Sequence, residues 1–173
     1  MPSILHTQRL VIRDITDDDL PFIHKGLSDP DVIKYYGVSY NTLEEAKSQM
    51  AWYKEIESSN TGKWWLIVAA NSAIAMGAIG FNYYQKQHNR IELGFWLLPE
   101  YQGSGIMLEA LTVLIPDFVA KWNIHRVEAL VETENTASKK LLMKAGFLCD
   151  GLLRDYEQKD GRYISLEVFS KLF

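Results

Sequence analysis

Residues 91–111 read IELGFWLLPEYQGSGIMLEAL, an apolar run, a turn with two glycines and a second apolar run. The first run predicts a β-strand over about 90–98, and the second predicts a helix over 106–122. Pro116 lies inside that helix, so we expect a kink or a break near Ile115. A glycine turn that opens a helix offers unpaired main-chain N–H groups and the positive end of the helix dipole. The stretch therefore predicts an anion site, and phosphate is the first candidate.

Two well-known phosphate-binding motifs do not fit this turn. The pattern GxxxxGK[ST] is absent, and GxGxxG would need a third glycine where Leu108 stands. For the two glycines alone, a tight turn with no ligand remains the alternative. The residues around the turn must decide between these two interpretations.

The rest of the chain predicts a mixed sheet covered by helices. A strand at 9–14 precedes a helix that begins after Thr16, and a second helix over 42–57 begins at Thr42 with Glu45 in capping-box spacing. Short turns join strands at 64–70, 73–84 and 90–98, so these strands should be antiparallel. A strand at 126–132, a helix at 135–144 and a hairpin that turns at 160–161 follow. The strands 90–98 and 126–132 should be parallel and joined by the helix between them, which gives an α/β (α+β) fold.

Composition favours one globular domain, 1–173, that acts on small molecules or proteins. The chain is 47% hydrophobic with a net charge of −4, which argues mildly against nucleic acid as a partner. The N-terminus shows no secretion signal, so we expect a cytoplasmic protein. Residues 64–84 carry no charge, but Asn71 and Ser72 interrupt them, and two strands explain them better than a membrane span. The four histidines show no ligand spacing, so we expect no metal site, and Cys149 should be a packing residue.

Four segments resemble the GCN5-related N-acetyltransferase (GNAT) superfamily. The turn QGSGIM, 102–107, resembles the pyrophosphate-binding motif Gln/Arg-x-x-Gly-x-Gly/Ala, with Met107 as a departure at the last position. The segments that resemble the RimJ/RimL ribosomal-protein acetyltransferase branch, in family order, are TQRLVIRDITDDDL, IELGFWLLPEYQGSGIMLEAL, HRVEALVETENTASKKLLMKAGF and GLLRDYEQKDGRY. The resemblance implies the GNAT fold, with a mixed, mostly antiparallel sheet of about seven strands and about four helices. It also implies transfer of acetyl from acetyl-coenzyme A to a primary amine.

The resemblance also implies which residues bind coenzyme A. The main chain of the turn would hold the pyrophosphate, and the end of the preceding strand would pair with the pantetheine and donate to the thioester oxygen. An asparagine and a serine at the start of the helix 135–144 would complete the site. The implied residues are Phe95, Trp96, Leu97, Leu98, Gln102, Gly103, Ser104, Gly105, Ile106, Met107, Asn135 and Ser138.

Two residues are candidates for proton transfer. Glu92 matches the position where many superfamily members carry the base that takes the amine proton, although water alone could serve and leave Glu92 structural. The resemblance to the RimJ/RimL branch, where a serine at this position lies near the sulfur, makes Ser138 the candidate acid for the departing thiol; most other branches have a tyrosine near the sulfur, at the position of Leu142. Asn135 could instead only cap its helix. Tyr35 and Tyr36 are candidates for binding the acceptor.

Two questions stay open at the level of sequence. The acceptor could be a protein N-terminus or a small-molecule amine, and the protein could be a monomer or a homodimer. A non-catalytic module that binds acyl-coenzyme A is the alternative to an enzyme. Such a module would need neither Glu92 nor Ser138, so their presence favours the enzyme.

Overall fold

The computed structural model describes residues 4–173, and its centre is one eight-stranded sheet with strand order β1-β2-β3-β4-β5-β6-β8-β7. All neighbouring strands are antiparallel except β5 and β6. The strands are β1 (Leu5–His6), β2 (Leu10–Asp14), β3 (Lys63–Ala69), β4 (Ala75–Gln85), β5 (Arg90–Leu97), β6 (Arg126–Glu132), β7 (Leu148–Lys159) and β8 (Arg162–Leu172).

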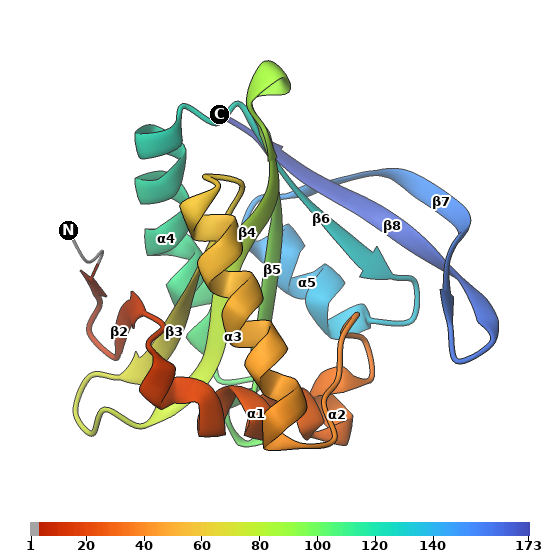
Figure 1. Ribbon diagram of the computed structural model, residues 1–173. Coiled ribbons are helices and arrows are strands. Elements are labelled where there is room, and N and C mark those ends of the chain that lie inside the picture. Colours follow the sequence, from red (N-terminus) through yellow and green to blue (C-terminus); the bar gives the residue numbers. More distant parts are fainter. Residues whose placement is uncertain (1–3) are drawn as a thin grey trace.

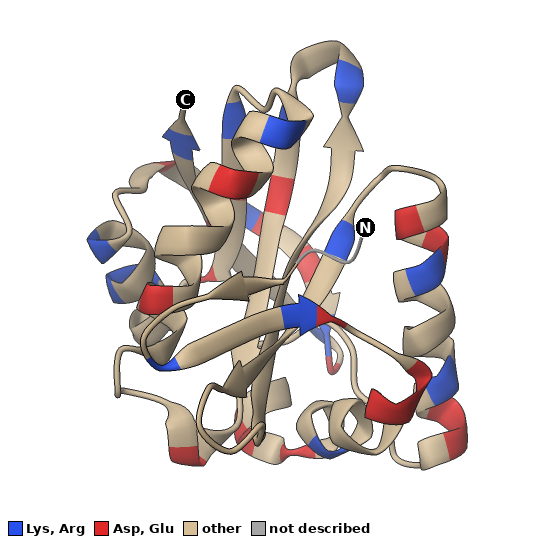
Figure 2. Cartoon of the chain, turned by 90° about the vertical axis from the view of Figure 1, so that its left-hand side faces the viewer, with Lys and Arg blue, Asp and Glu red and all other residues tan. Residues whose placement is uncertain are grey.

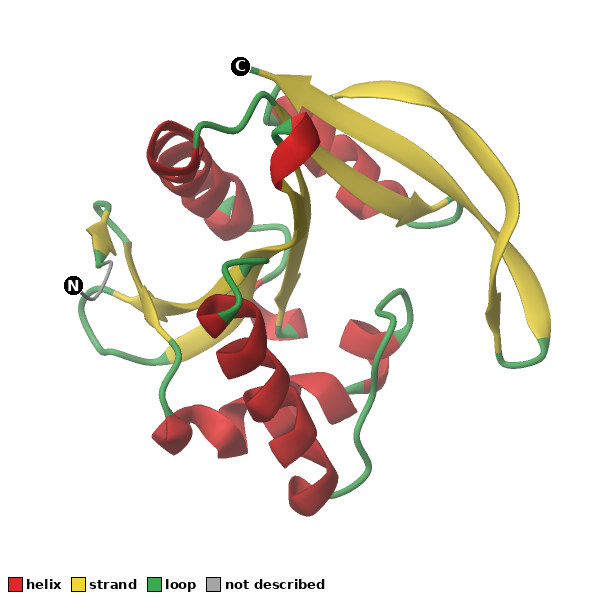
Figure 3. Cartoon of the chain, turned by 45° about the horizontal axis from the view of Figure 1, so that its top comes forward, coloured by secondary structure: helices red, strands yellow, loops and turns green. Residues whose placement is uncertain are grey.

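Helices cover both faces of the sheet (Figures 1 and 3). One face carries α1 (Leu20–Ser28), α2 (Pro30–Ile33) and α3 (Leu43–Ser58), and the other carries α4 (Ile106–Trp122) and α5 (Thr136–Lys144). The short 3₁₀ helices are η1 (Asp17–Asp19), η2 (Lys86–His88) and η3 (Pro99–Tyr101).

Lys and Arg residues lie among Asp and Glu residues on the side shown in Figure 2, which agrees with the small net charge.

Each face of the sheet buries its own apolar core. Under α4 and α5, the ring of Phe118 stacks on Phe81 with centroids 4.2 Å apart. Under α1, α2 and α3, Ile23 and Leu27 pack with Trp64 and other buried side chains. The alternation of side chains along each strand supplies both cores, because successive residues point to opposite faces.

The sheet opens between β5 and β6. These parallel strands pair only where Arg90–Glu92 meets Arg126–Glu128. Beyond that point β5 stays paired with β4, whereas β6 stays paired with β8 (Figure 1). The edge of β5 that faces β6 therefore has main-chain groups free for a ligand from Leu93 onward.

The structure confirms the predicted mixed sheet and the parallel β5-α4-β6 crossover, with one more strand and one more helix than expected. Of the kink or break expected near Ile115, the break is wrong, since α4 runs from Ile106 to Trp122 without interruption. Pro116 and Thr112 both lie on the exposed side of α4, where water can donate to the Thr112 carbonyl in place of the N–H that proline lacks.

Two other sequence expectations have clear outcomes. Residues 64–84 form β3 and β4, and no helix within residues 4–173 is long and apolar enough to cross a membrane. The packing role expected for Cys149 is wrong, because this residue is exposed on the edge strand β7.

Candidate active site

A cleft of about 450 Å³ lies between the end of β5, the glycine turn and α5, and we call it the narrow cleft. Most of the residues that the sequence assigned to coenzyme A line it, together with side chains from α2 and from the segment that follows it. The predicted residues that line it are Phe95, Trp96, Leu97, Gln102, Gly103, Gly105, Ile106, Met107, Asn135 and Ser138, together with Tyr35 and Tyr36.

The glycine turn presents a set of free donors to this cleft. Gly103 and Gly105 have φ angles of 71° and 79°, a left-handed conformation that only glycine adopts at low cost. Within residues 4–173, no acceptor takes a hydrogen bond from the main-chain N–H groups of residues 103–107. These groups open the 17-residue helix α4, so the helix dipole adds to their attraction for an anion.

Hydrogen bonds on the far side hold the turn in this shape. Gln102 donates its Nε2 to the carbonyl of Leu97 at 2.9 Å, and Arg9 donates its Nη1 to the carbonyl of Ser104 at 3.1 Å. The carbonyl and the N–H group of a trans peptide point in opposite directions. Fixing the Ser104 carbonyl on Arg9 therefore turns the N–H of Gly105 away from Arg9.

Two lysines add positive charge to the narrow cleft. Lys140 and Lys144 stand four residues apart on α5 and both line it. The sequence analysis missed them, although their i, i+4 spacing indicates one face of a helix. Free N–H groups and two lysines make the narrow cleft suitable for a ligand with several phosphates.

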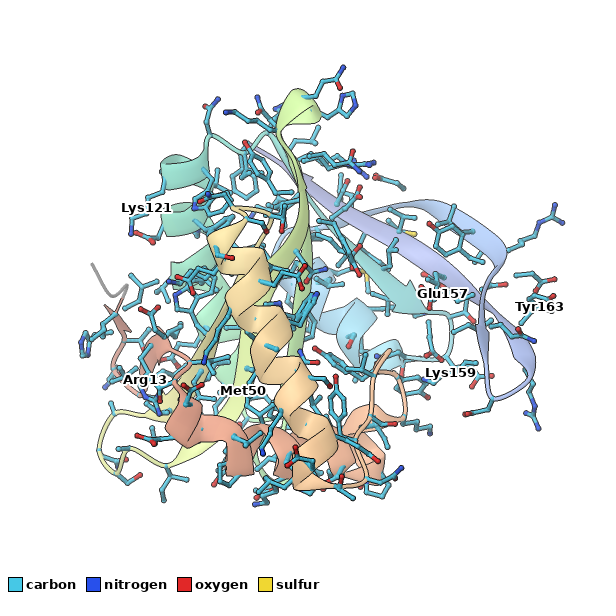
Figure 4. All side chains as sticks on the ribbon, in the orientation of Figure 1. Arg13, Met50, Lys121, Glu157, Lys159 and Tyr163 are labelled. Atoms are coloured by element: carbon cyan, nitrogen blue, oxygen red, sulfur yellow. The ribbon has the colours of Figure 1, made fainter. Side chains whose placement is uncertain are left out.

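A second cleft, of about 1080 Å³, lies between the α1–α3 side and the strands β6, β7 and β8, and we call it the wide cleft. Aromatic side chains form one wall, where Tyr36 and Trp52 lie within 6.5 Å and 6.3 Å of Trp64, measured between ring centroids. Lys159 of β7 bonds to the carbonyl of Lys34 after α2, and so connects the opposite wall to this one (Figure 4).

The two clefts meet at a common boundary. The residues that line both are Tyr35, Tyr36, Phe95, Asn135 and Ser138. Burial raises the pKa of Tyr36 well above its ordinary value, so its hydroxyl stays protonated and can donate a hydrogen bond. Ligands bound in the two clefts would therefore touch each other beside these residues.

Glu92 of β5 faces the wide cleft in an environment that favours its neutral form. Burial, and then the charge of Glu128, raise the pKa of Glu92 to about 7. Asn82, which is buried in β4, donates its Nδ2 to Glu92 Oε1 at 3.4 Å. Near neutral pH a large fraction of Glu92 is ionised and able to accept a proton, which is the property of a general base.

The other charged groups of the wide cleft are mostly paired. Glu128 accepts from Arg126 at 2.9 Å and lies 3.5 Å from Arg90, and Glu132 pairs with Lys159 at 2.7 Å. Among the described residues, Glu157 and Glu92 are the carboxylates of this cleft without an ion-pair partner, and each lining cation has one. The unpaired charge that the cleft offers to a ligand is negative.

Asn135 and Ser138 stand at the start of α5. Asn135 Oδ1 accepts from the N–H of Ser138 at 3.1 Å, so Asn135 caps the helix as its spacing predicts. The Asn135 amide nitrogen and the Ser138 hydroxyl donate to no acceptor within residues 4–173. Leu142 is fully buried in the core under α4 and α5. Ser138 thus offers a free hydroxyl at the boundary, whereas position 142 offers none.

Two predicted coenzyme residues do not line the narrow cleft. Leu98 is 1% exposed, and its N–H donates to the carbonyl of Met76 at 3.0 Å. Ser104 donates its hydroxyl to the carbonyl of Tyr101 at 2.7 Å.

The sequence analysis also missed two carboxylates of the wide cleft, Glu128 and Glu132. The alternation of RVEALVE places both on one face of β6.

The pattern of the family described as "Acetyltransferase (GNAT) domain" matches residues 9–148. The chain belongs to the GNAT acetyltransferase family. The uncharacterized N-acetyltransferase YoaA of Bacillus subtilis (strain 168) is 32% identical over 98% of this chain and 97% of its own length. This GNAT protein is therefore an acetyl-coenzyme A-dependent N-acetyltransferase, and the alternative of a non-catalytic module is not supported.

Solved structures share the fold of this GNAT protein at low sequence identity. RimL, a ribosomal L7/L12 alpha-N-protein acetyltransferase, has a TM-score of 0.90 and 20% identity, with 100% of this chain and 96% of that chain covered. Spermidine N-acetyltransferase from Vibrio cholerae, in complex with CoA and spermine, has a TM-score of 0.84 and 21% identity, with 96% of each chain covered. The resemblance to the RimJ/RimL branch is confirmed at the level of family and fold.

Proposed function

We propose that this acetyltransferase acetylates the free α-amino group at the N-terminus of a peptide or protein. The acceptor enters through the wide cleft, and acetyl-coenzyme A lies in the narrow cleft. The observation that carries the proposal is Glu92, a carboxylate with a pKa of about 7 on the wall of the wide cleft.

The pKa of Glu92 suits an α-amine better than a side-chain amine. An α-ammonium group has a pKa of about 7.7–8.0, so transfer of its proton to Glu92 costs roughly 1 kcal/mol. A lysine-type ammonium with a pKa of about 10.4 would cost about 4.6 kcal/mol for the same transfer. The lower cost favours an N-terminal acceptor, and it is small enough for a base as weak as Glu92.

The residues at the boundary supply the remaining steps. Glu92 accepts the proton of the ammonium group, and the free amine then attacks the acetyl carbonyl. The main-chain N–H groups of Phe95 and Leu97, on the unpaired edge of β5, donate to the carbonyl oxygen as it gains charge. Ser138 donates its proton to the departing sulfur, the nitrogen of the new amide releases its second proton to water, and Ser138 recovers a proton from that water. Direct transfer needs both substrates bound together, and the shared boundary of the two clefts supports this.

The narrow cleft fits the phosphates of coenzyme A. The free N–H groups of residues 103–107 would bind the diphosphate, and Lys140 and Lys144 would pair with phosphate oxygens. Asn135 would donate through its free amide nitrogen while it caps α5. Tyr35 and Tyr36, at the boundary, would contact the acceptor next to its reacting nitrogen.

A polyamine is the second candidate acceptor. Glu157 is a second unpaired carboxylate on the wide cleft, and it could hold an ammonium group distant from the one that reacts. The Vibrio cholerae enzyme with the same fold, whose structure contains spermine, supports this alternative.

Thiol release with matched acceptors tests the proposal. A set of short peptides would carry either a free N-terminus and no lysine, or a blocked N-terminus and one lysine, and would be compared with spermine. We expect kcat/KM for free N-termini to exceed the value for blocked lysine peptides by at least about a hundredfold, within the roughly 400-fold that the difference in proton-transfer cost allows. Preference for spermine or for the lysine side chain would overturn the N-terminal acceptor.

A further inference from the structure

Tyr83 of β4 has an unusual main-chain conformation beside Glu92. Its φ angle is 56°, in the left-handed region that a bulky side chain rarely adopts. Asn82 pairs with Glu92 and Gln85 pairs with Arg90, so Tyr83 and Tyr84 together stand opposite the single residue Ile91. This is a β-bulge, a feature that redirects side chains.

The bulge moves Tyr83 from the core to the wide cleft. In a regular strand Tyr83 would point to the same face as Phe81, which is fully buried under α4. Tyr84 takes that place instead, and its ring meets Trp122 of α4 with centroids 5.3 Å apart. Two consecutive residues, Asn82 and Tyr83, consequently both line the wide cleft.

The ring of Tyr83 contributes little to the packing of the fold. Tyr83 is 65% exposed. Within residues 4–173 its ring has no aromatic partner, and its hydroxyl forms no hydrogen bond. A strained conformation that brings an aromatic ring to a site without benefit to the core is typical of a residue retained for function.

We propose that Tyr83 is a specificity-determining residue that packs against the part of the acceptor next to its reacting amine. This inference rests on the proposed role of the wide cleft as the acceptor site. A tyrosine ring is rigid and offers apolar surface, so it favours an acceptor with apolar atoms beside the amine. Its position next to the Asn82–Glu92 pair places that contact where the amine loses its proton.

Tyr83→Gly tests this proposal, because it removes both the backbone strain and the aromatic ring. The melting temperature reports the loss of strain, and the acceptor KM reports the loss of the ring. Glycine adopts a positive φ without strain, so we expect the melting temperature to rise by about 3 °C. We also expect the KM for the acceptor to rise about tenfold, with kcat changed less than threefold and coenzyme A affinity unchanged. Tyr83→Phe keeps the ring and should leave the acceptor KM within about twofold of the wild type.

Ala73→Gly is the matched control for strain. Ala73 has a φ of 55° in the turn between β3 and β4, and it lines neither cleft. We expect this change to raise the melting temperature without any effect on the acceptor KM. An unchanged acceptor KM in Tyr83→Gly, or a lower melting temperature, would overturn the proposal.

The measurements distinguish a failure of the N-terminal acceptor proposal from a failure of the Tyr83 proposal. The KM measurements use whichever acceptor the wild-type protein acetylates best in the panel described above. If that acceptor is spermine, the N-terminal acceptor is wrong, yet a tenfold rise of its KM in Tyr83→Gly still supports the role of Tyr83. If a peptide is best and its KM does not respond, the N-terminal acceptor stands and the role of Tyr83 is wrong.

Discussion

Arg9, directly before β2, is bound to Glu109 in the first turn of α4, with Arg9 Nε 2.6 Å from Glu109 Oε2. The same guanidinium donates to the carbonyl of Ser104, so one side chain joins the N-terminal strands, the glycine turn and the helix. Arg9 is half exposed, and the pair by itself contributes little to stability. Arg9 instead contributes by fixing the orientation of the glycine turn.

Arg9→Ala should therefore weaken coenzyme A binding more than it destabilises the fold. Without the guanidinium, the Ser104–Gly105 peptide is free to rotate, and its N–H group is no longer preorganised. We expect a Kd for coenzyme A about tenfold higher by calorimetry, with a melting temperature within about 3 °C of the wild type. Lys121→Ala is the control, since it removes an ion pair with Asp117 near the other end of α4 (Figure 4). Equal affinities in the two variants would contradict the role of Arg9.

Gly105→Glu should abolish coenzyme A binding while the protein still folds. A Cβ at this position would lie 3.6 Å from Arg9 Nη2, an ordinary contact, so the change adds charge and backbone strain without a clash. The added carboxylate would lie beside Arg9, where its charge would repel a diphosphate and compete with Ser104 and Glu109 for the guanidinium. Calorimetry on the folded variant checks this result.

Gly161→Glu provides the matched control for Gly105→Glu. Gly161 has a φ of 74° in the turn between β7 and β8, and a Cβ there meets no atom within 4 Å. The same strain and the same charge are then placed away from the narrow cleft. If both variants lose coenzyme A equally, the glycine turn is not the diphosphate site.

Glu92→Gln should remove the acidic limb of the pH–rate profile. In the wild type, kcat/KM should fall as the pH decreases through about 7, because Glu92 becomes protonated and can no longer accept a proton. The variant should be about a hundredfold slower at pH 7, with unchanged coenzyme A affinity. A wild-type profile without a limb near pH 7, or a variant with normal rates, would show that water removes the proton.

The same variant should be more stable than the wild type at alkaline pH. The folded-state pKa of Glu92 is about 7, above the value of about 4.5 in the unfolded chain, so the folded protein holds its proton more tightly. The stability linked to that proton is fully present below pH 4.5 and is lost as the pH rises through 7. Glu92→Gln should then unfold like the wild type near pH 4 and be up to about 3 kcal/mol more stable at pH 9. Denaturant unfolding at the two pH values measures the difference.

The sequence predicts the coenzyme side of the site better than the acceptor side. The glycine turn, Asn135 and Ser138 lie within two short segments whose geometry follows from helix starts. Both segments line the same cleft once β5 and β6 are parallel. The wide cleft depends on strand register. The β4 bulge exchanges the faces of Tyr83 and Tyr84, and a second register shift, between Leu153 and Glu157, precedes the carboxylate that β7 brings to the cleft. A bulge shifts side chains by one residue, which the alternation of residue types does not reveal.

Ser138→Ala should slow catalysis modestly, because the leaving group needs little help. A thiol with a pKa of about 8.5 lies about 1.5 units above neutral pH, so an acid can contribute roughly 2 kcal/mol, or about 30-fold in rate. We expect about a tenfold loss of kcat at pH 7 and a smaller loss at pH 9, where thiolate leaves without a proton. Asn135→Ala is the comparison, since it removes the cap of α5 and a donor to coenzyme A, and it should raise the Kd for coenzyme A. A loss of more than about a thousandfold in Ser138→Ala, with coenzyme A affinity retained, would mean that the hydroxyl positions the thioester at the boundary of the two clefts instead of supplying a proton.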